Sequence, residues 1–258
     1  MLVSIIITNY NYGKYLHRCI RSCLNQTLPT NQFEVILVDD FSNDGSDKIA
    51  NEYKTVPNFK VIRNKKNLGV SKSSNNAIKV AKGRYVVRVD SDDFVTNEFI
   101  NILSYYLKEK PSYLGASSDY YLVNDDGKKL SKISSKLKPV SCGILYNKKK
   151  LLKAGLYNPK FKHREEEELR YRLDKEYKIF HTNLALYRYR MHRSNKTKSN
   201  DYINIFKDKI NNLKKSKLIK EYGNKKILKN ISVIIPARGN SKRLKNKNIY
   251  PFKGMPMV

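Results

Sequence analysis

The chain has 258 residues, of which 40% are hydrophobic, with 19 Tyr and 9 Phe, enough for one sizeable core or one domain plus a fragment. No apolar run approaches the roughly 18 residues that a bilayer-spanning helix needs, and the apolar start at Leu2–Thr8 has no basic region before it, unlike a signal peptide. Three cysteines, an odd number, argue against a disulfide framework and favour a reducing, cytoplasmic location.

The formal net charge of +29 has two interpretations. It could attract the phosphates of nucleic acid, anionic lipid or anionic glycan. It could also be a compositional bias, because Lys, Asn, Ile and Tyr are all abundant. A nucleic-acid-binding protein would gather its lysines on one face with aromatic residues between them. The lysines are instead dispersed, so no nucleic-acid partner is expected.

The first ninety residues alternate between strand and helix patterns. The expected strands are Val3–Thr8, Phe33–Val38, Phe59–Arg63 and Val86–Val89, and the expected helices are Tyr15–Leu24, Ser46–Tyr53 (capped by Ser46 or Asp47) and Ser71–Lys82. Cys19 and Cys23, four residues apart on the first helix, are interpreted as core residues. This alternation predicts an α/β fold with a mostly parallel, doubly wound, Rossmann-like sheet flanked by helices.

Polar residues follow three of these strands: Tyr10, then Asp39-Asp40, then the carboxylates Asp90, Asp92 and Asp93. The carboxyl ends of parallel strands meet at one edge of a sheet, where ligands bind. Carboxylates this close repel one another, and Mg²⁺ or Mn²⁺ would relieve the repulsion and bridge to phosphate oxygens. The alternative for an isolated Asp-rich turn is a solvated helix cap.

Four segments in order resemble family 2 glycosyltransferases with the GT-A-type fold. They are Val3–Asn11, Val38–Ser46, Asn67-x-Gly69 and Asp90-Ser91-Asp92-Asp93, and the resemblance covers about the first two hundred residues. It implies that Thr8 and Tyr10 line the base pocket and that Asp39 or Asp40 accepts the N3–H of uracil. It also implies that Asp90 approaches the ribose or a metal and that Asp92 ligates Mn²⁺ or Mg²⁺.

After Phe94 the patterns predict a helix at Asn97–Lys108, a strand at Tyr113–Val123 and a hairpin turn at Asn124–Gly127. Ser141–Tyr146 resembles the family's strand beside the acceptor, and Leu151–Gly155 resembles the short helix that follows it.

Glu165–Glu168 stand in succession in an expected helix, so most of them should face water. However, Glu168-Leu169-x-x-Arg172-Leu173 resembles the family's Glu-Leu-x-x-Arg-Leu helix, whose preceding acidic pair faces the acceptor. An inverting transferase needs a carboxylate to take the proton of the attacking hydroxyl. The resemblance implies that Glu166 is this base, with Glu165 as the alternative.

Tyr187–Thr197 resembles the segment that closes the family's catalytic domain. It implies that His192 completes the metal site or contacts the diphosphate, with a purely structural histidine as the equal alternative. Arg190 or Arg193 would neutralise the leaving diphosphate.

The remainder divides into a basic helical linker, residues 201–229, and a short restart, residues 230–258. The helix expected at Asp201–Tyr222 could pack on the catalytic domain, which is favoured, or lie on an anionic membrane surface. Ile231–Pro236 and the basic loop at Ala237–Ile249 resemble the opening of acylneuraminate (sialic-acid-type) cytidylyltransferases, whose loop cradles CTP phosphates. Ending at Val258, this would be an incomplete second α/β domain, so we expect a fragment of a longer protein.

The sequence therefore predicts a metal-dependent, inverting glycosyltransferase in residues 1–200. It would transfer a sugar from a nucleotide-diphosphate donor, with UDP favoured, to a glycan or lipid-linked hydroxyl in cell-surface polysaccharide biosynthesis. The alternatives are a bifunctional glycosyltransferase and cytidylyltransferase, of which this would be a piece, and the disfavoured nucleic-acid-binding protein.

Residues 231–258 are expected to be dispensable for glycosyl transfer, because one strand and a loop cannot bury an apolar face of their own. A chain that ends at Lys229 should keep the donor affinity, measured by calorimetry, and the transfer rate of the full chain. A collapse of stability or activity would show that the tail belongs to the catalytic domain.

Overall fold

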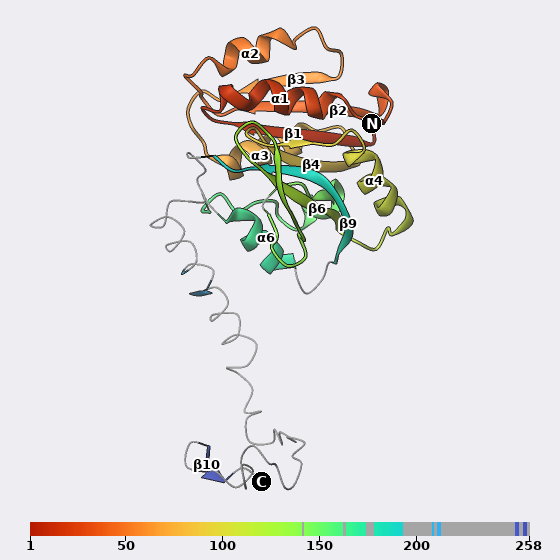
Figure 1. Cartoon of the computed structure of the whole chain (residues 1–258), viewed down its shortest axis with the longest axis vertical. Coiled ribbons are helices and arrows are strands. Elements are labelled where there is room, and N and C mark those ends of the chain that lie inside the picture. The colour runs from red at the N-terminus through yellow and green to blue at the C-terminus, as the bar shows by residue number, and fades with distance from the viewer. Residues whose placement is uncertain are drawn as a thin grey trace. The chain divides into compact units, whose positions relative to one another are not determined.

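The computed structural model describes residues 1–140, 142–161, 164–173 and 178–192, together with 208, 211–212, 251–252 and 255–256. The chain forms two compact units, Met1–Ile210 and Asn211–Val258. In the described part of the first unit, nine strands make one sheet in the order β3-β2-β1-β4-β8-β6-β9-β5, with β7 paired to β6 (Figure 1).

The strands are β1 Val3–Asn9, β2 Phe33–Asp39, β3 Phe59–Arg63, β4 Tyr85–Asp90, β5 Phe94–Val95, β6 Gly115–Val123, β7 Lys129–Ile133, β8 Leu145–Asn147 and β9 Ile179–Arg190. The α-helices are α1 Gly13–Leu24, α2 Ser46–Glu52, α3 Val70–Val80, α4 Phe99–Glu109, α5 Lys148–Lys153 and α6 Glu165–Leu173, and Thr30–Gln32 forms a 3₁₀ turn. The expected alternation of the first ninety residues is confirmed, with bounds that differ by one or two residues.

Strands β3, β2, β1 and β4 are parallel, as predicted. Their register pairs Asn9 with Asp39 and Thr8 with Asp90, so the polar residues that follow β1, β2 and β4 meet at one edge. The other half of the sheet is mixed, because β8 is antiparallel to both β4 and β6 whereas β9 runs parallel to β6.

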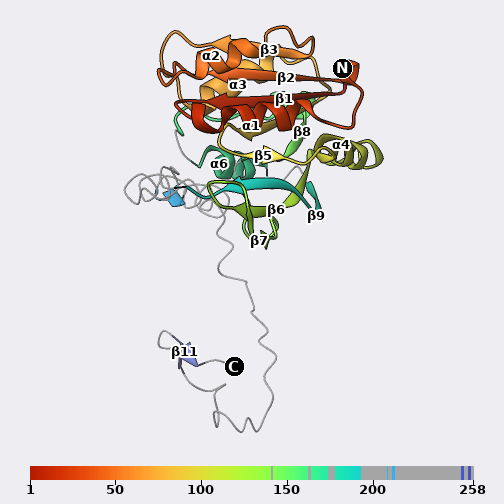
Figure 2. The ribbon, with the colours of Figure 1, turned by 45° about the horizontal axis from the view of Figure 1, so that its top comes forward.

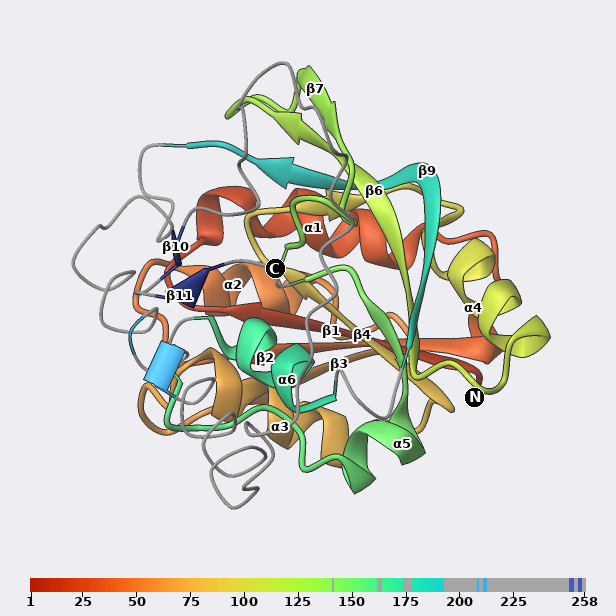
Figure 3. The same cartoon turned by 90° about the horizontal axis from the view of Figure 1, so that it is seen from below.

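Helices cover both faces of the parallel half, which explains why its central strands β1, β2 and β4 are buried along nearly their whole length rather than at every second residue. Ile5 and Ile7 of β1 belong to the core that includes α1, α2 and α4, with Cys19 and Cys23 fully buried in it. Ile6, whose side chain points the opposite way, belongs to the second core with residues of α3, α5 and α6. Figure 3 shows these two helical layers on either side of the central strands.

The expected hairpin is confirmed, because β6 and β7 pair in antiparallel fashion on either side of the turn at Asn124–Gly127. The sequence did not predict β9, a strand of 12 residues that runs beside β6 and also pairs with β5 (Figure 2). Through this strand, Arg190 and His192 reach the loop that follows β4.

The expected cap of α2 is wrong. Neither Ser46 nor Asp47 provides it; the N-cap position is Gly45, whose φ of 87° favours glycine. Asp44 instead accepts hydrogen bonds from the Ser46 N–H at 3.2 Å and from the Gly13 N–H at 2.7 Å. This carboxylate therefore joins the first turns of α1 and α2.

In the second unit, the structure describes a short antiparallel pair, β10 Pro251–Phe252 and β11 Met255–Pro256. The expected strand at Ile231–Pro236 and loop at Ala237–Ile249 lie outside the described residues, as does nearly all of the expected basic helix. Among the described residues, none of the helices combines the length and the apolar character that crossing a membrane requires.

Candidate active site at the carboxyl edge of the sheet

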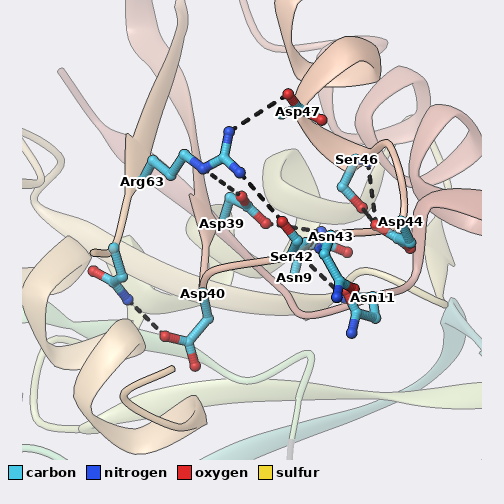
Figure 4. Close-up of polar contacts among 11 residues, drawn as sticks. Asn9, Asn11, Asp39, Asp40, Ser42, Asn43, Asp44, Ser46, Asp47 and Arg63 are labelled. Carbon is cyan, nitrogen blue, oxygen red and sulfur yellow. Dashed lines mark hydrogen bonds and ion pairs between the residues drawn. The ribbon is translucent and has the colours of Figure 1, made fainter. Parts of the chain in front are cut away.

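Asp39, the last residue of β2, and Asp40, which follows it, have different surroundings (Figure 4). Both Asp40 oxygens are occupied, because Oδ1 accepts from Asn64 Nδ2 and the Leu68 N–H, and Oδ2 accepts from the Gly69 N–H, each at 2.8 Å. Asp40 therefore fixes the loop that leads into α3.

Asp39 is 2% exposed and points to the opposite side of the backbone. Its Oδ1 accepts a hydrogen bond from Asn9 Nδ2 at 3.3 Å. Its Oδ2 lies 3.5 Å from Arg63 Nε as an ion pair, but it is buried and accepts no hydrogen bond within the described part of the chain. A buried carboxylate oxygen of this kind can accept a hydrogen bond from a ligand.

The turns around Asp39 are tied together by side chains (Figure 4). Ser42 Oγ accepts from Asn9 Nδ2 at 3.1 Å and from the Asn11 N–H at 3.0 Å. Thr8 is half-buried in β1, and Tyr10, 36% exposed, follows at the edge. Of the two predicted base-pocket residues, Thr8 therefore lies in β1, the strand paired with β2, and Tyr10 lies directly after it.

At the end of β4, Arg88 bridges two acidic residues from distant parts of the chain. Its Nε lies 3.1 Å from Asp90 Oδ1, and its Nη1 lies 2.8 Å from Glu165 Oε1. Burial raises the pKa of the Asp90 carboxyl, and Asp92 and Glu165 raise it further, while Arg88 opposes the shift. Asp90 Oδ1 also accepts no hydrogen bond within the described residues. A cation beside Asp90 would offset this accumulation of negative charge.

Asp92 and His192, both predicted metal ligands, are in contact, with His192 Nε2 3.0 Å from Asp92 Oδ2. His192 is 6% exposed and is packed between two aromatic rings, Tyr15 at a centroid distance of 4.8 Å and Tyr12 at 5.6 Å. Burial, followed by Asp92 and Asp90, raises the pKa of the Tyr12 hydroxyl.

Asp93 and Arg190 connect the same loop to β9. Asp93 accepts hydrogen bonds from Tyr187 Oη at 2.7 Å and from the Arg190 N–H at 2.8 Å. Arg190, 2% exposed, donates from Nε to the Asp92 carbonyl at 2.7 Å and from Nη1 to the Asp125 carbonyl. Arg190, which is predicted to contact the diphosphate, is thus buried and bonded to the backbone of Asp92.

The predicted metal trio is not gathered as one group. In the part of the chain that the structure describes, the three ligand atoms that lie within 4.8 Å of one another come from Asp90, Asp93 and Cys142. Burial, then Asp90 and Asp93, raise the pKa of the Cys142 thiol well above its usual value, and Mg²⁺ and Mn²⁺ prefer oxygen ligands. The residues present therefore fit a hard divalent cation through their carboxylates and not through the thiol.

The expectation that most of the four glutamates face water is wrong. Exposed fractions are 4% for Glu165, 1% for Glu166 and 2% for Glu168. Each has a partner from another turn or element: Arg88 for Glu165, Tyr146 for Glu166 and Arg172 for Glu168.

Glu166 keeps one buried carboxylate oxygen without a hydrogen bond in the described part of the chain. Its Oε1 accepts from Tyr146 Oη, while Oε2 is buried and has no hydrogen-bond partner among the described residues. Burial raises the pKa of the Glu166 carboxyl, although Tyr146 and Arg88 lower it. Glu165 is instead held in an ion pair by Arg88.

Two residues of this site were missed in the sequence. Arg88 carries a charge inside the apolar run of β4, and a buried charge implies a partner, which was the available signal. Tyr187 had no such signal, because its bond to Asp93 spans 94 residues.

The chain matches the model of glycosyl transferase family 2 over residues 4–195, and it belongs to that family. A second family model, cytidylyltransferase, matches residues 232–258. The fold class predicted from the sequence is confirmed by solved structures. One is Staphylococcus aureus TarS 1-349 in complex with UDP-GlcNAc, with a TM-score of 0.67 and 24% identity, over 77% of this chain and 61% of that one.

Two relatives in sequence are named as transferases. Glycosyltransferase GlyG of Streptococcus pneumoniae is 35% identical over 127 residues, 49% of this chain and 42% of that protein. Poly(ribitol-phosphate) beta-N-acetylglucosaminyltransferase TarP of Staphylococcus aureus is 39% identical over 115 residues, 43% of this chain and 35% of that protein. The chain thus spans less than half the length of either relative.

Proposed function

We propose that this chain transfers a sugar from a uridine diphosphate donor to a hydroxyl of a cell-surface glycan, with inversion at the anomeric carbon and with a divalent cation. The observation that carries the proposal is the buried Asp39 Oδ2, which has no hydrogen-bond partner in the described residues and stands on the strand edge shared with Asp90. A carboxylate there accepts the N3–H of uracil, whereas cytosine offers only an acceptor at N3. The names of TarP and GlyG support the same class of reaction.

In this proposal, Thr8 and Tyr10 border the base, and Asp90 and Asp92 hold Mn²⁺ or Mg²⁺, with His192 orienting Asp92. The cation would supply charge neutralisation for the diphosphate as it departs. Arg190 adds positive charge directly behind Asp92. These residues would bind and orient the donor.

Glu166 would take the proton of the acceptor hydroxyl as the acceptor oxygen bonds to the anomeric carbon and the bond to the diphosphate oxygen breaks. Its raised pKa suits a general base, because a more basic carboxylate removes the proton more readily. The Arg88 ion pair would keep Glu165 in place beside it.

We further propose that residues 230–258 belong to a different domain from the transferase, with a basic linker over 201–229. The cytidylyltransferase match over 232–258 supports this division. A longer protein that carries the rest of such a domain would be bifunctional.

Asp39→Asn should shift the base preference from uracil towards cytosine. The amide can donate to the N3 of cytosine, and the loss of the negative charge weakens the hydrogen bond from the N3–H of uracil. We expect UDP affinity to fall by about tenfold to a hundredfold, and the ratio of UDP to CDP affinity to fall further. Calorimetry with both nucleotides and Mn²⁺ measures this. Asp40→Asn is the matched control: it should lower the unfolding free energy by about 1–3 kcal/mol and leave the ratio unchanged. An unchanged ratio in the Asp39 variant would refute the assignment.

Asp92→Asn should remove the metal dependence of donor binding, since an amide oxygen is a weaker ligand and carries no charge. The parent chain should bind UDP more tightly with Mn²⁺ than with EDTA, and the variant should bind equally in both. Asp126→Asn makes the same change at an exposed position and should behave as the parent. If the Asp92 variant keeps the full response to Mn²⁺, another residue holds the metal.

Glu166→Gln should cut transfer by about 10²–10⁴, the usual contribution of a positioned base, and leave UDP affinity nearly unchanged. Release of UDP from UDP-sugars in the presence of poly(ribitol phosphate) gives the rate. In the parent, the rate should fall as the pH drops through a pKa above the ordinary glutamate value, because the protonated base is inactive. A loss of this size in Glu165→Gln, with none in Glu166→Gln, would move the role by one residue.

A further inference from the structure

A cavity of about 160 Å³ lies beside the candidate active site and contains none of its proposed catalytic or metal-binding residues. It is bordered by residues of β6, β9, α6 and the chain between β7 and β8: Ser117, Ser118, His181, Tyr187, Arg170, Ser135, Lys136, Pro139, Val140, Cys142, Gly143 and Ile144. Pockets for whole drug-sized ligands have volumes of about 300–1,000 Å³, so this cavity fits one small unit of a larger molecule.

One wall of the cavity is a hydrogen-bonded network. Asp119, 4% exposed, lies 3.0 Å from His181 Nε2, and His181 Nδ1 lies 3.2 Å from Ser135 Oγ and 3.4 Å from Ser117 Oγ. With Nε2–H donating to the carboxylate, Nδ1 is left to accept the proton of a serine hydroxyl. The serine oxygens can then accept hydrogen bonds from the hydroxyls of a ligand.

Two other polar groups of the cavity need a hydrogen-bond acceptor that a ligand could supply. Ser118 is 5% exposed, and its Oγ is buried with no hydrogen-bond partner in the described residues. Arg170 Nε is likewise buried and donates no hydrogen bond within the described residues. Buried polar groups are nearly always paired, so these two indicate a missing partner. Lys136, an exposed residue, adds a further positive charge to the rim.

The cavity adjoins the proposed chemistry on two sides. Tyr187, one of its lining residues, donates to Asp93, and Cys142, another, lies 3.7 Å from the same carboxylate. Arg170 follows Glu166 by four residues on α6, so the two side chains are on the same helical face. A unit bound in the cavity would therefore be a neighbour of the reacting hydroxyl.

We propose that this cavity binds a polyol-phosphate unit of the acceptor, next to the unit that carries the reacting hydroxyl; this rests on the proposed glycosyl transfer. The phosphate would accept from Arg170, Lys136 and Ser118, and the polyol hydroxyls would donate to Ser135 and Ser117. Val140 and Ile144 provide apolar surface for the carbon chain. The chemical class is thus an anionic, hydroxylated chain rather than an uncharged sugar.

Ligand-observed NMR titrations of the full chain with ribitol phosphate, ribitol and inorganic phosphate test the proposal. Ribitol phosphate should bind at least about tenfold more tightly than either part alone. Ser118→Ala and Arg170→Gln should each weaken it by roughly tenfold, the loss typical of one hydrogen bond to a charged group. Equal binding of inorganic phosphate would overturn the polyol contact, and equal binding of ribitol would overturn the phosphate contact.

Ser118→Ala also separates a ligand role from a structural one. Because its hydroxyl is unpaired and buried, removing it should leave the melting temperature unchanged or raise it while binding weakens. Ser104→Ala is the matched control: Ser104 is 1% exposed and donates to the Asn101 carbonyl at 3.1 Å on α4, so this variant should melt lower and bind normally. A Ser118 variant that melts lower with unchanged binding would contradict the proposal.

UDP affinity, measured on the same samples, keeps this inference distinct from the proposed function. UDP binding without ribitol phosphate binding would refute the cavity assignment and leave the transferase proposal standing. Ribitol phosphate binding without UDP binding would refute the donor assignment instead.

Discussion

The structure depends on how negative charge is held at the end of β4. Asp90, Asp92, Asp93 and Glu165 crowd together, and ion pairs or hydrogen bonds from residues of β4 itself and of β9 hold them there. Arg88 lies between Asp90 and Glu165. From β9, Tyr187 and Arg190 donate hydrogen bonds to the loop that follows β4. Removing one partner of a buried ion pair is strongly destabilising, because it leaves the other charge buried and uncompensated. The same arrangement therefore constrains the fold and leaves capacity for a cation.

Asp39 and Asp40, adjacent in sequence at the end of β2, have different roles in the structure. Successive side chains point to opposite sides, so Asp40 turns toward the loop before α3 and Asp39 toward Asn9 and Arg63. Both Asp40 oxygens accept hydrogen bonds from backbone N–H groups and Asn64, whereas Asp39 retains one buried oxygen that accepts none among the described residues. A single shift in register would exchange these roles, which is why the pairing of Asn9 with Asp39 matters for the site.

Much of this organisation could be predicted from the sequence. The apolar strands β1 to β4 and the helices between them are local patterns, and the parallel arrangement follows from their alternation. The polar residues after three strands had to meet at one edge. The choice between Asp39 and Asp40 could not be made, because it depends on which of them the Asn64–Gly69 segment contacts.

Contacts across long distances in sequence account for what was missed. The burial of Glu165 and Glu166 depends on Arg88 and Tyr146, which a helical pattern cannot reveal. Strand β9 was missed because its neighbours, β5 and β6, lie some 60 to 95 residues earlier. The cavity between β6, β9 and α6 has the same origin, since Ser118 and Arg170 are unremarkable in the sequence.

A crystal structure of the chain with UDP and Mn²⁺ tests the central claim, that the joined ends of β1, β2 and β4 form a uridine diphosphate site. We expect the uracil N3 within hydrogen-bond distance of Asp39 Oδ2, and Mn²⁺ bound to Asp92 and the diphosphate. UDP bound elsewhere, or bound at this edge with its base away from Asp39, would contradict the account.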